Sequence, residues 1–384
     1  MKIAFISVMG GTPWGGSEEL WRKTALLALK AGHEVLISTF KWTPTHPNLN
    51  ELKTKGAKTV FRELPENYFK NKNIWKRIVE KLLNAEPIFK REIKEIESFA
   101  ADIYVVNEGG TFDLFAFPHL EKFLHNKSNI IVHQLNKENY IPTQEIIQKA
   151  QIVYSKVFKH VFVAAKNKLT TEKQIALSLP NSLIIYNPPS FDISLIRKSR
   201  DKSKGQSVNF SIVGRLECNH KGHHLLLEIL KGDVWTERQW HLNVYGSGPH
   251  EKYLRSLSQY YEIGHRVTFH GFIEDKETIW LNNDILLLPS LYEGTPLVLV
   301  ESMFFGVTSV INDVGGCSEI SIDNETTFLS KSPNQTSFGN ALERAWQNQG
   351  NWNEMGLRAK KHITKLYKKL PEEKMLQLIE SYSE

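Results

Sequence analysis

The sequence predicts an α/β protein made of two doubly wound domains, each with a parallel sheet covered by helices on both faces. Short apolar runs of strand length recur along the whole chain. Segments of helix length separate these runs, which is the alternation that builds parallel sheets. The length of 384 residues exceeds what one hydrophobic core usually supports, and 41% apolar residues are ordinary for a globular protein. We therefore expect two domains.

The predicted strands form two groups separated by a polar segment. That segment, 188–207, contains two prolines, a charged stretch and a glycine, and is predicted to be a linker. It divides the chain into an N-terminal domain at 1–187 and a C-terminal domain at 208–370, followed by a helix at 371–384. The predicted strands lie at 2–8, 33–39, 102–107, 129–134, 160–165, 209–214, 241–246, 266–271, 284–290 and 308–313.

The stretch Ser290–Gly306 carries the most informative pattern. The apolar run at 284–290 predicts a strand, a Gly-Thr-Pro turn follows at 294–296, and apolar residues then continue at helical spacing. Glu293 lies just before the predicted helix and Glu301 lies inside it, a little over two helical turns further on. Two carboxylates on one side of this element suit hydroxyl groups at the two ends of an elongated ligand. The unpaired amides at the helix start, behind a proline in its first turn, suit an anion.

These residues resemble the E-x7-E signature of retaining GT-B glycosyltransferases, in particular of glycosyltransferase family 4 (GT4). Residues 1–39 look like the family's opening strand, diglycine loop and helix, and 212–230 resembles the segment that opens its second domain. Stretches at 242–254, 267–290 and 310–320 also match in order and spacing, and the second half is the more specific. The resemblance implies the GT-B fold, in which two Rossmann-like domains face each other across a cleft and the last helix packs back on the first domain.

The resemblance also implies a role for each matching position. Arg215 and Lys221 would hold the diphosphate of a nucleotide-sugar donor, and they follow a strand at its exit, where open α/β sheets bind ligands. Glu301 would bind the ribose hydroxyls and Glu293 the hydroxyls of the donor sugar. His133, at the end of a first-domain strand, matches a position that contacts this sugar. The other donor positions are Gly15 and Gly16 near the phosphates, a turn at Gly246, the base-binding main chain at Gly271, Phe272 and Ile273, and the sugar pocket at Gly294, Thr295, Pro296 and Leu297.

The acceptor is expected on the first domain, where the family motifs are least diagnostic. Many relatives carry His-rich residues after one of its strands, whereas this chain has Asn107 and Glu108 there, and Glu108 is a candidate for binding a hydroxyl. The other candidate acceptor residues are Trp14, Glu18 and Tyr140. The resemblance implies a hexosyltransferase that uses a UDP- or GDP-sugar and a glycan or lipid-linked acceptor, in bacterial surface polysaccharide biosynthesis.

The sequence predicts no bound metal, and no cofactor besides the donor substrate. It lacks a D-x-D motif and has no His and Cys residues clustered at metal-ligand spacing. The leaving diphosphate would then be neutralised by Arg215 and Lys221, with amides near Gly16 and at the helix start after Glu293. By resemblance, the leaving phosphate takes the acceptor proton in a same-face reaction. A double displacement is the alternative, and no nucleophile for it is evident.

Cysteine content, apolar content and charge indicate the expected cellular location and membrane contact. Cys218 and Cys317 offer no disulfide framework, and nowhere do eighteen apolar residues run together, so a cytoplasmic protein without a signal peptide or membrane-spanning helix is expected. The net charge is +6, and the segment 70–96 is rich in Lys and Arg. Its apolar residues recur at helical spacing. It is either a helix on the inner face of an anionic membrane, with Trp75 near the headgroups, or an ordinary amphipathic helix on the first domain. No nucleic-acid recognition module is evident.

Two other functions stay open on the sequence alone. A non-catalytic nucleotide-sugar-binding scaffold protein would use the same fold, although it would have no need for the full set of charged site residues. A sugar-nucleotide epimerase of the GT-B fold would need added acid and base carboxylates, and none is evident. An NAD-dependent dehydrogenase is disfavoured, because the first strand leads into GGTPWGG and not into G-x-G-x-x-G.

Overall fold

The computed structural model describes residues 1–63, 90–193, 196 and 207–382. The chain divides into unit 1, Met1–Pro188 together with Lys369–Glu384, and unit 2, Pro189–Lys368. These limits are close to the domain boundaries expected from the sequence. Most of the basic segment 70–96 and most of the expected linker 188–207 lie outside the described residues.

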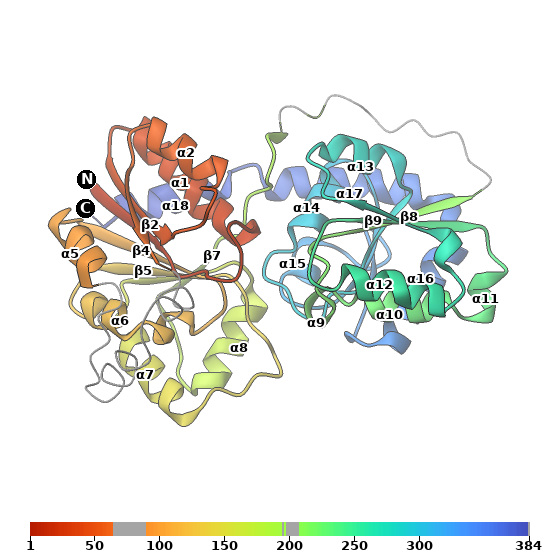
Figure 1. The fold of residues 1–384 in the computed structure, drawn as a ribbon, viewed down its shortest axis with the longest axis horizontal. Helices are drawn as coiled ribbons and strands as arrows, with labels where there is room; N and C mark the ends of the chain where they lie inside the picture. Colours follow the sequence, from red (N-terminus) through yellow and green to blue (C-terminus); the bar gives the residue numbers. More distant parts are fainter. Residues whose placement is uncertain (64–89, 194–195, 197–206, 383–384) are drawn as a thin grey trace. The chain divides into compact units, whose positions relative to one another are not determined.

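Unit 1 is built on one parallel sheet with helices on both of its faces (Figure 1). Its strands are β1 (Lys2–Ser7), β2 (Glu34–Phe40), β3 (Lys58–Arg62), β4 (Ile103–Glu108), β5 (Asn129–His133), β6 (Lys159–Phe162) and β7 (Ser182–Ile184). Its helices are α1 (Glu19–Lys30), α2 (Pro47–Thr54), α5 (Lys90–Ser98), α6 (Pro118–Leu124), α7 (Gln144–Tyr154), α8 (Ala165–Ile175) and α18 (Pro371–Glu380), with 3-10 turns η1 (Gly16–Glu18) and η2 (Asp113–Ala116). The strand order is β3-β2-β1-β4-β5-β6-β7, which reverses direction between β1 and β4 as in doubly wound folds.

Both faces of this sheet are buried. Ile3 and Phe5 belong to one apolar cluster, and Ala4 and Ile6, which alternate with them along β1, belong to another. Because successive side chains of a strand point to opposite faces, a strand can contribute to two cores only when helices cover both faces. This explains why the strands read as apolar runs rather than as alternating patterns.

The last helix, α18, is part of unit 1. It lies against α1, where Figure 1 draws the blue C-terminal helix beside the red N-terminal elements. Met375, Leu378 and Ile379 are buried in the cluster that contains Ile3 and Phe5. A segment from beyond unit 2 therefore completes the first core.

Unit 2 repeats the architecture around a second parallel sheet. Its strands are β8 (Val208–Val213), β9 (Trp240–Tyr245), β10 (Val267–Gly271), β11 (Ile285–Leu288), β12 (Ser309–Asn312) and β13 (Phe328–Ser330). Its helices are α9 (Cys218–Lys221), α10 (His223–Leu230), α11 (Asp233–Thr236), α12 (Glu251–Tyr260), α13 (Lys276–Asn282), α14 (Leu297–Phe304), α15 (Cys317–Ile320), α16 (Gln335–Gln347) and α17 (Trp352–Leu366), with 3-10 turns η4 (Gly264–Arg266) and η5 (Gln349–Asn351). The strand order is β10-β9-β8-β11-β12-β13, with the reversal between β8 and β11.

The predicted fold class is confirmed. Each predicted strand overlaps an observed one, and two doubly wound parallel sheets result. The sequence analysis missed β3, β7 and β13. All three lie at sheet edges.

Candidate functional site

The candidate site of unit 2 lies where its strand order reverses. Open α/β sheets bind ligands outside the carboxyl ends of their strands at such a point. Here those ends belong to β8, which leads into α9 and α10, and to β11, which leads through the loop 289–296 into α14. The predicted charged residues are on these two connections.

Lys221 and Glu293 form the central contact of the site. Lys221 Nζ donates to Glu293 Oε1 at 2.6 Å, and the two side chains are 18% and 7% exposed. Burial alone would raise the pKa of Glu293. The charge of Lys221, with hydrogen bonds from Lys221 and Ser290, instead holds this pKa below its ordinary value. Glu293 is therefore a carboxylate at neutral pH, and its lone pairs can accept hydrogen bonds from hydroxyl groups.

Two glycines fix the backbone around this pair. Gly222, between α9 and α10, has a φ of +66°, and a Cβ at this position would lie 2.1 Å from the carbonyl oxygen of Pro289. Gly315 has a φ of +52°, and a Cβ there would lie 2.2 Å from the carbonyl oxygen of Glu293. Only glycine combines a left-handed backbone with such close approach. The connection after β8 and the connection after β11 therefore meet in direct backbone contact at this edge of the sheet.

His220 is a site residue that the sequence analysis did not single out. Its ring stacks on Tyr292 at a centroid distance of 4.3 Å and an interplanar angle of 1°. Its Nε2 lies 3.9 Å from Glu293 Oε2. Burial, together with the charge of Lys221, lowers the pKa of His220 to about 4, so the ring is neutral near pH 7. Its position directly before Lys221 is the signal that could have identified it.

Glu301 lies on the helix that follows Glu293. The helix α14 begins at Leu297, with Pro296 at its N-cap rather than in its first turn as predicted. Glu301 is 5% exposed, and its Oε1 accepts a hydrogen bond from Ser190 Oγ at 2.8 Å. The carboxyls therefore have the predicted placement, one before the helix and one within it. Between them, Gly294, Thr295 and Pro296 are buried, and Leu297 is half-buried.

The other predicted donor residues lie at neighbouring strand ends of the same sheet. Arg215 follows β8 and is exposed. Gly246 follows β9, and its amide donates to the carbonyl oxygen of Gly271, the last residue of β10, at 2.7 Å. Phe272 is 73% exposed and Ile273 is half-buried. The carboxyl ends of β8, β9, β10 and β11 thus place all of these residues along one edge of the sheet.

The diglycine loop of unit 1 leads into a buried carboxyl. The turn η1 (Gly16–Glu18) follows Gly15, and Glu18 is 3% exposed. Ser7 Oγ, Trp21 Nε1 and Asn107 Nδ2 donate to the Glu18 carboxyl at 3.0, 2.9 and 2.9 Å. Burial raises the pKa of Glu18 to about 7. Its carboxyl faces the interior, which does not agree with the predicted contact to an acceptor.

Glu108 and His133 also lie inside unit 1, on adjacent strands in register. Glu108 Oε2 lies 2.8 Å from His133 Nδ1, and both side chains are fully buried. His133 Nε2 contacts His160 Nδ1 at 3.0 Å, and His160 Nε2 contacts the carbonyl oxygen of Tyr154 at 3.0 Å. The Tyr154 hydroxyl returns to Glu108 at 3.2 Å, which closes the network.

The buried network favours neutral groups. Burial raises the pKa of Glu108 to about 8 and lowers the pKa of His133 and of His160 to about 3. Glu108 and His133 share one proton. The chain of hydrogen bonds is the same whether this proton is on Glu108 Oε2 or on His133 Nδ1. The predicted roles of His133 at the donor sugar and of Glu108 at the acceptor do not agree with these buried positions.

The remaining acceptor candidates of unit 1 keep some exposed surface. Trp14 is half-buried, donates through Nε1 to Glu19 Oε1 at 2.8 Å and stacks on His46 at 4.7 Å. Tyr140 is 41% exposed. These contacts hold the Trp14 ring in place beside the diglycine loop.

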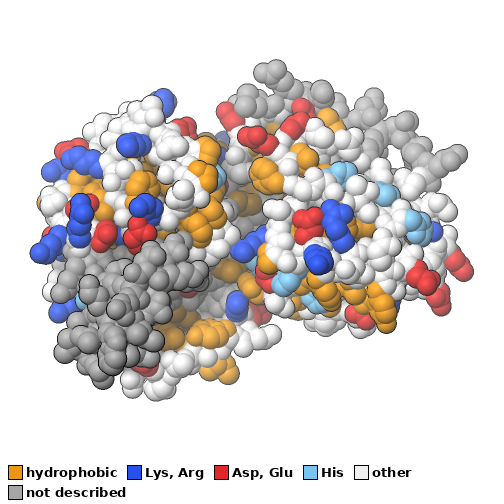
Figure 2. All heavy atoms as spheres, viewed as in Figure 1, with side chains coloured by type: hydrophobic (Ala, Val, Ile, Leu, Met, Phe, Trp, Pro, Cys, Tyr) orange, Lys and Arg blue, Asp and Glu red, His pale blue; other side chains and the backbone are white. Residues whose placement is uncertain are grey.

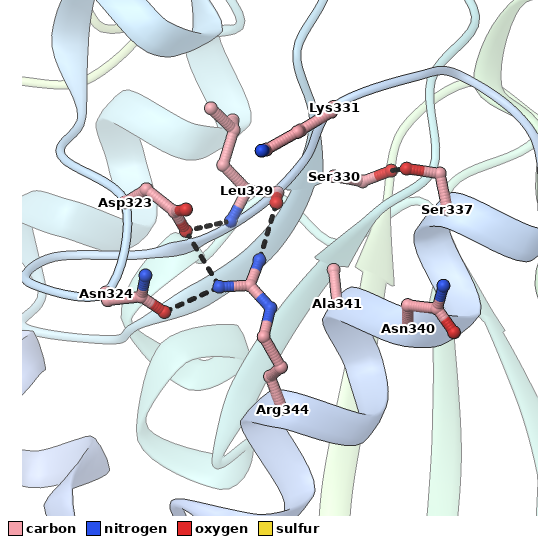
Figure 3. A pocket seen from close by; sticks show the side chains of 9 residues that line it. All are labelled: Asp323, Asn324, Leu329, Ser330, Lys331, Ser337, Asn340, Ala341 and Arg344. Carbon is pink, nitrogen blue, oxygen red and sulfur yellow. Dashed lines mark hydrogen bonds and ion pairs between the residues drawn. The ribbon is translucent and has the colours of Figure 1, made fainter.

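A separate hollow of about 420 Å³ lies in unit 2 between β13 and α16 (Figure 3). Arg344 points into it, but its guanidinium is bonded to Asp323 Oδ1, Asn324 Oδ1 and the carbonyl oxygen of Leu329. These bonds tie the loop before β13 to α16. Arg344 therefore has a structural explanation, and none of the predicted site residues lines this hollow.

The described residues contain neither a metal-binding cluster nor a membrane-spanning helix. No group of three or more His, Cys, Asp or Glu side chains in the described ranges has an arrangement that could hold a metal ion. Among the helices that the structure describes, none is long and apolar enough to cross a membrane.

Comparison with known proteins bears on unit 2 most directly. Residues 193–362 match the family model of the glycosyl transferases group 1. This region contains Arg215, Lys221, Glu293 and Glu301. The match to the group 1 model therefore covers all four charged residues that were predicted in unit 2.

Curated relatives match over shorter stretches. An uncharacterised 41.2 kDa protein from the cps region of Klebsiella pneumoniae is 28% identical over 153 residues, which are 38% of this chain and 40% of the relative. The lipopolysaccharide 1,6-galactosyltransferase of Salmonella typhimurium is 27% identical over 145 residues, 36% of this chain and 38% of that protein. The chain thus matches about two fifths of the length of these relatives.

Solved structures resemble the chain along its whole length. HepE from Anabaena, in complex with UDP-glucose, has a TM-score of 0.74 at 15% identity, and the alignment covers 99% of each chain. At this identity the likeness shows the fold alone, and that fold is GT-B.

Proposed function

We propose that this protein is a glycosyltransferase that moves a sugar from a UDP- or GDP-sugar to a glycan or lipid-linked acceptor, in bacterial surface polysaccharide biosynthesis. One observation carries the proposal. Lys221 and Glu293 pair at the switch point of unit 2, within the region that matches the group 1 family, and Glu301 follows on the adjoining helix. The relatives from a cps region and from lipopolysaccharide synthesis support the setting, and the UDP-glucose bound by HepE supports the donor class.

The charges of the site suit a nucleotide sugar. The Glu293 carboxylate, kept ionised by Lys221, would accept hydrogen bonds from the donor-sugar hydroxyls, and Glu301 would accept them from the ribose. Lys221 and Arg215 would meet the diphosphate, helped by the backbone amides at the start of α14. When the sugar–phosphate bond breaks, negative charge grows on the phosphate oxygens, and fixed cations there stabilise the transition state more than the ground state.

The proposed reaction retains the anomeric configuration and needs no metal ion. The sequence lacks a D-x-D motif, and Lys221 with Arg215 supplies positive charge where a cation would otherwise neutralise the diphosphate. The leaving phosphate would take the acceptor proton on the same face of the sugar. Trp14 and Tyr140 are the proposed acceptor contacts.

We also propose contact with the cytoplasmic face of an anionic membrane. Its support is the basic composition of segment 70–96, which lies mostly outside the described residues. On the face of unit 1 shown in Figure 2, Lys and Arg side chains are interspersed with Asp and Glu over the described surface. Because the basic residues of segment 70–96 would supply the attraction, charge reversal at Lys76, Arg77 and Lys81 should reduce co-sedimentation with anionic vesicles. Unchanged co-sedimentation would leave the core-helix interpretation.

The test is a binding panel of UDP, GDP, ADP and NAD, followed by the matching sugar nucleotides, measured by calorimetry in EDTA. We expect UDP or GDP to bind, and Glu301→Ala to weaken that binding about 10-fold or more, because the carboxylate accepts charge-assisted hydrogen bonds from the ribose. Glu237→Ala, at an exposed position of the same unit, is the matched control and should bind as wild type does.

The outcomes separate the competing functions. Sugar transfer to a glycan acceptor in EDTA supports the complete proposal. Activity that disappears in EDTA and returns with manganese contradicts the metal-free reaction. Binding of a sugar nucleotide without turnover on any acceptor favours the scaffold, and a preference for NAD excludes the proposed donor class.

A further inference from the structure

Glu301 has a protein partner that comes from the start of unit 2. Ser190 Oγ donates to Glu301 Oε1 at 2.8 Å. Ser190 lies outside any helix or strand and is itself exposed, whereas Glu301 is 5% exposed. The contact joins residues that are far apart in the chain, so the fold has to bring this short segment over α14.

The segment that carries Ser190 is fastened to the same helix. The Phe191 ring packs on Phe304 at 6.3 Å and on Phe305 at 5.5 Å, measured between centroids. Phe304 ends α14 and Phe305 is its C-cap, and they follow Glu301 by three and four residues, so they lie on the same side of the helix end as Glu301. Aromatic pairs of this kind contribute beyond the area that they bury. Phe191 therefore anchors the segment on the face that presents Glu301.

The chain before Ser190 is stiff as well. Pro188 and Pro189 precede it, and a proline ring fixes the backbone angle φ near −65°. Ser190 thus has two prolines before it and an anchored aromatic ring after it. Its backbone therefore loses little conformational entropy when the hydroxyl group bonds Glu301. It is a preorganised donor for the carboxylate of Glu301.

The hydrogen bond restricts the carboxyl group of Glu301. The terminal torsion of a glutamate side chain is broad and intrinsically soft, so a buried carboxylate without a fixed donor can rotate about its last bond. One donor on Oε1 sets the plane of the group. Each carboxylate oxygen has two lone pairs, so Oε1 can accept a second hydrogen bond while Oε2 accepts another. A hydrogen bond from Ser190 therefore does not by itself saturate the carboxylate.

We propose that Ser190 is a positioning residue for ribose recognition, which holds the Glu301 carboxylate in the plane needed to accept both hydroxyls of a nucleotide ribose. This inference rests on the proposed nucleotide-sugar function, and it extends the site to a residue outside the motifs that carry the family resemblance. Its signature is selectivity. Loss of the serine hydroxyl weakens a ribonucleotide more than the corresponding 2′-deoxyribonucleotide.

The experiment compares dissociation constants of UDP with 2′-deoxy-UDP, and of GDP with 2′-deoxy-GDP, by calorimetry on the full chain. Ser190→Ala should lower the preference for the ribose form about threefold to tenfold, the value of one hydrogen bond. Ser190→Thr keeps the hydroxyl and should restore the preference. In the Glu301→Ala background, Ser190→Ala should change nothing further. Ser256→Ala, an exposed serine on α12, is the matched control.

Each contrary result identifies which idea fails. A general structural defect would weaken the ribose and deoxyribose forms equally, so an unchanged preference in Ser190→Ala overturns the positioning role. A stronger preference would also overturn it, because Ser190 would then compete with the ribose for Glu301. If wild type binds none of the four nucleotides, the proposed function fails and this inference falls with it. If wild type prefers the ribonucleotides and the Ser190→Ala variant keeps that preference, only this inference fails.

Discussion

Replacing Lys221 with alanine tests the central contact of the site. The substitution leaves the Glu293 side chain, 7% exposed, without the ammonium group that lies 2.6 Å away. Removing one partner of a buried pair typically costs about 3–5 kcal/mol. Because Lys221 is 18% exposed, we expect the lower end, about 3 kcal/mol. For a domain of this size each kcal/mol lowers Tm by about 2–4 °C, so the transition of unit 2 should fall by about 6–12 °C.

The loss should depend on pH in a defined direction. The pKa of Glu293 in the folded protein lies below the value of 4.5 for a free side chain. The pair therefore stabilises the protein fully above pH 4.5, and this contribution is lost as pH falls through the lower folded pKa. Without Lys221, burial raises the pKa of Glu293 instead. At acidic pH the Glu293 carboxylate is therefore protonated to a greater extent in the variant than in wild type. The difference between variant and wild type should be full at pH 7.5 and smaller at pH 4.

Calorimetric unfolding of the full chain without nucleotide, at both pH values, measures this difference. Lys252→Ala, at an exposed position on α12, is the matched control and should change Tm little at either pH. Equal destabilisation by Lys221→Ala at pH 7.5 and pH 4 would refute the electrostatic reasoning. So would a loss no larger than that of the control, since the pair would then contribute nothing measurable.

Two further predictions concern the backbone beside this pair and the buried network of unit 1. Gly222→Ala should destabilise unit 2 by about 2 kcal/mol or more, because the left-handed backbone and the Pro289 carbonyl oxygen both oppose a Cβ. Gly339→Ala, within a helix where a Cβ meets only ordinary contacts, should be neutral or slightly stabilising, and a Gly222→Ala variant as stable as this control would contradict the packing argument. Glu108→Gln should weaken the pH dependence of stability between pH 6.5 and 8. The raised folded pKa of Glu108 makes wild type lose stability as pH rises toward about 8, and the lowered pKa of His133 acts only below this window. Urea unfolding across the window measures the slope, and equal slopes for variant and wild type would show that Glu108 does not titrate there.

Strand positions were predictable because both sheets are parallel and buried on both faces. Central strands such as β4 and β11 contain continuous apolar runs, IYVV in β4 and ILLL in β11, so they stand out from the amphipathic helices between them. The strands that the sequence analysis missed are edge strands. β7 has three residues with none fully buried, and β3 is buried at only two positions, so neither needs a continuous apolar run. Edge strands pair on one side only, and this weakens their sequence signal.

The part of the site in unit 2 was predictable in part. Glu293 and Glu301 take the expected positions because a turn and a helix start are local features. The ion pair between Lys221 and Glu293 depends on backbone contact between two distant connections, and no spacing in the sequence reveals it. The contact of Ser190 with Glu301 is equally distant.

The buried positions of three predicted site residues of unit 1 have one physical cause. Glu18, Glu108 and His133 follow or end strands, where a sequence reader expects side chains that face a ligand. Each instead finds partners inside the unit: Glu108 and His133 are in register on adjacent strands, and Asn107 reaches Glu18. His160, inside a run that reads as apolar, was the available signal that this interior holds polar groups.

The return of α18 to unit 1 has a consequence for synthesis on the ribosome. The cluster that contains Ile3 and Phe5 is completed by Met375, Leu378 and Ile379, which emerge only after all of unit 2 has been translated. Unit 2 is continuous in the chain and can fold as soon as its own residues have left the ribosome. The first part to be made is thus the last to be finished, and nascent unit 1 exposes the apolar surface of α1 for most of translation.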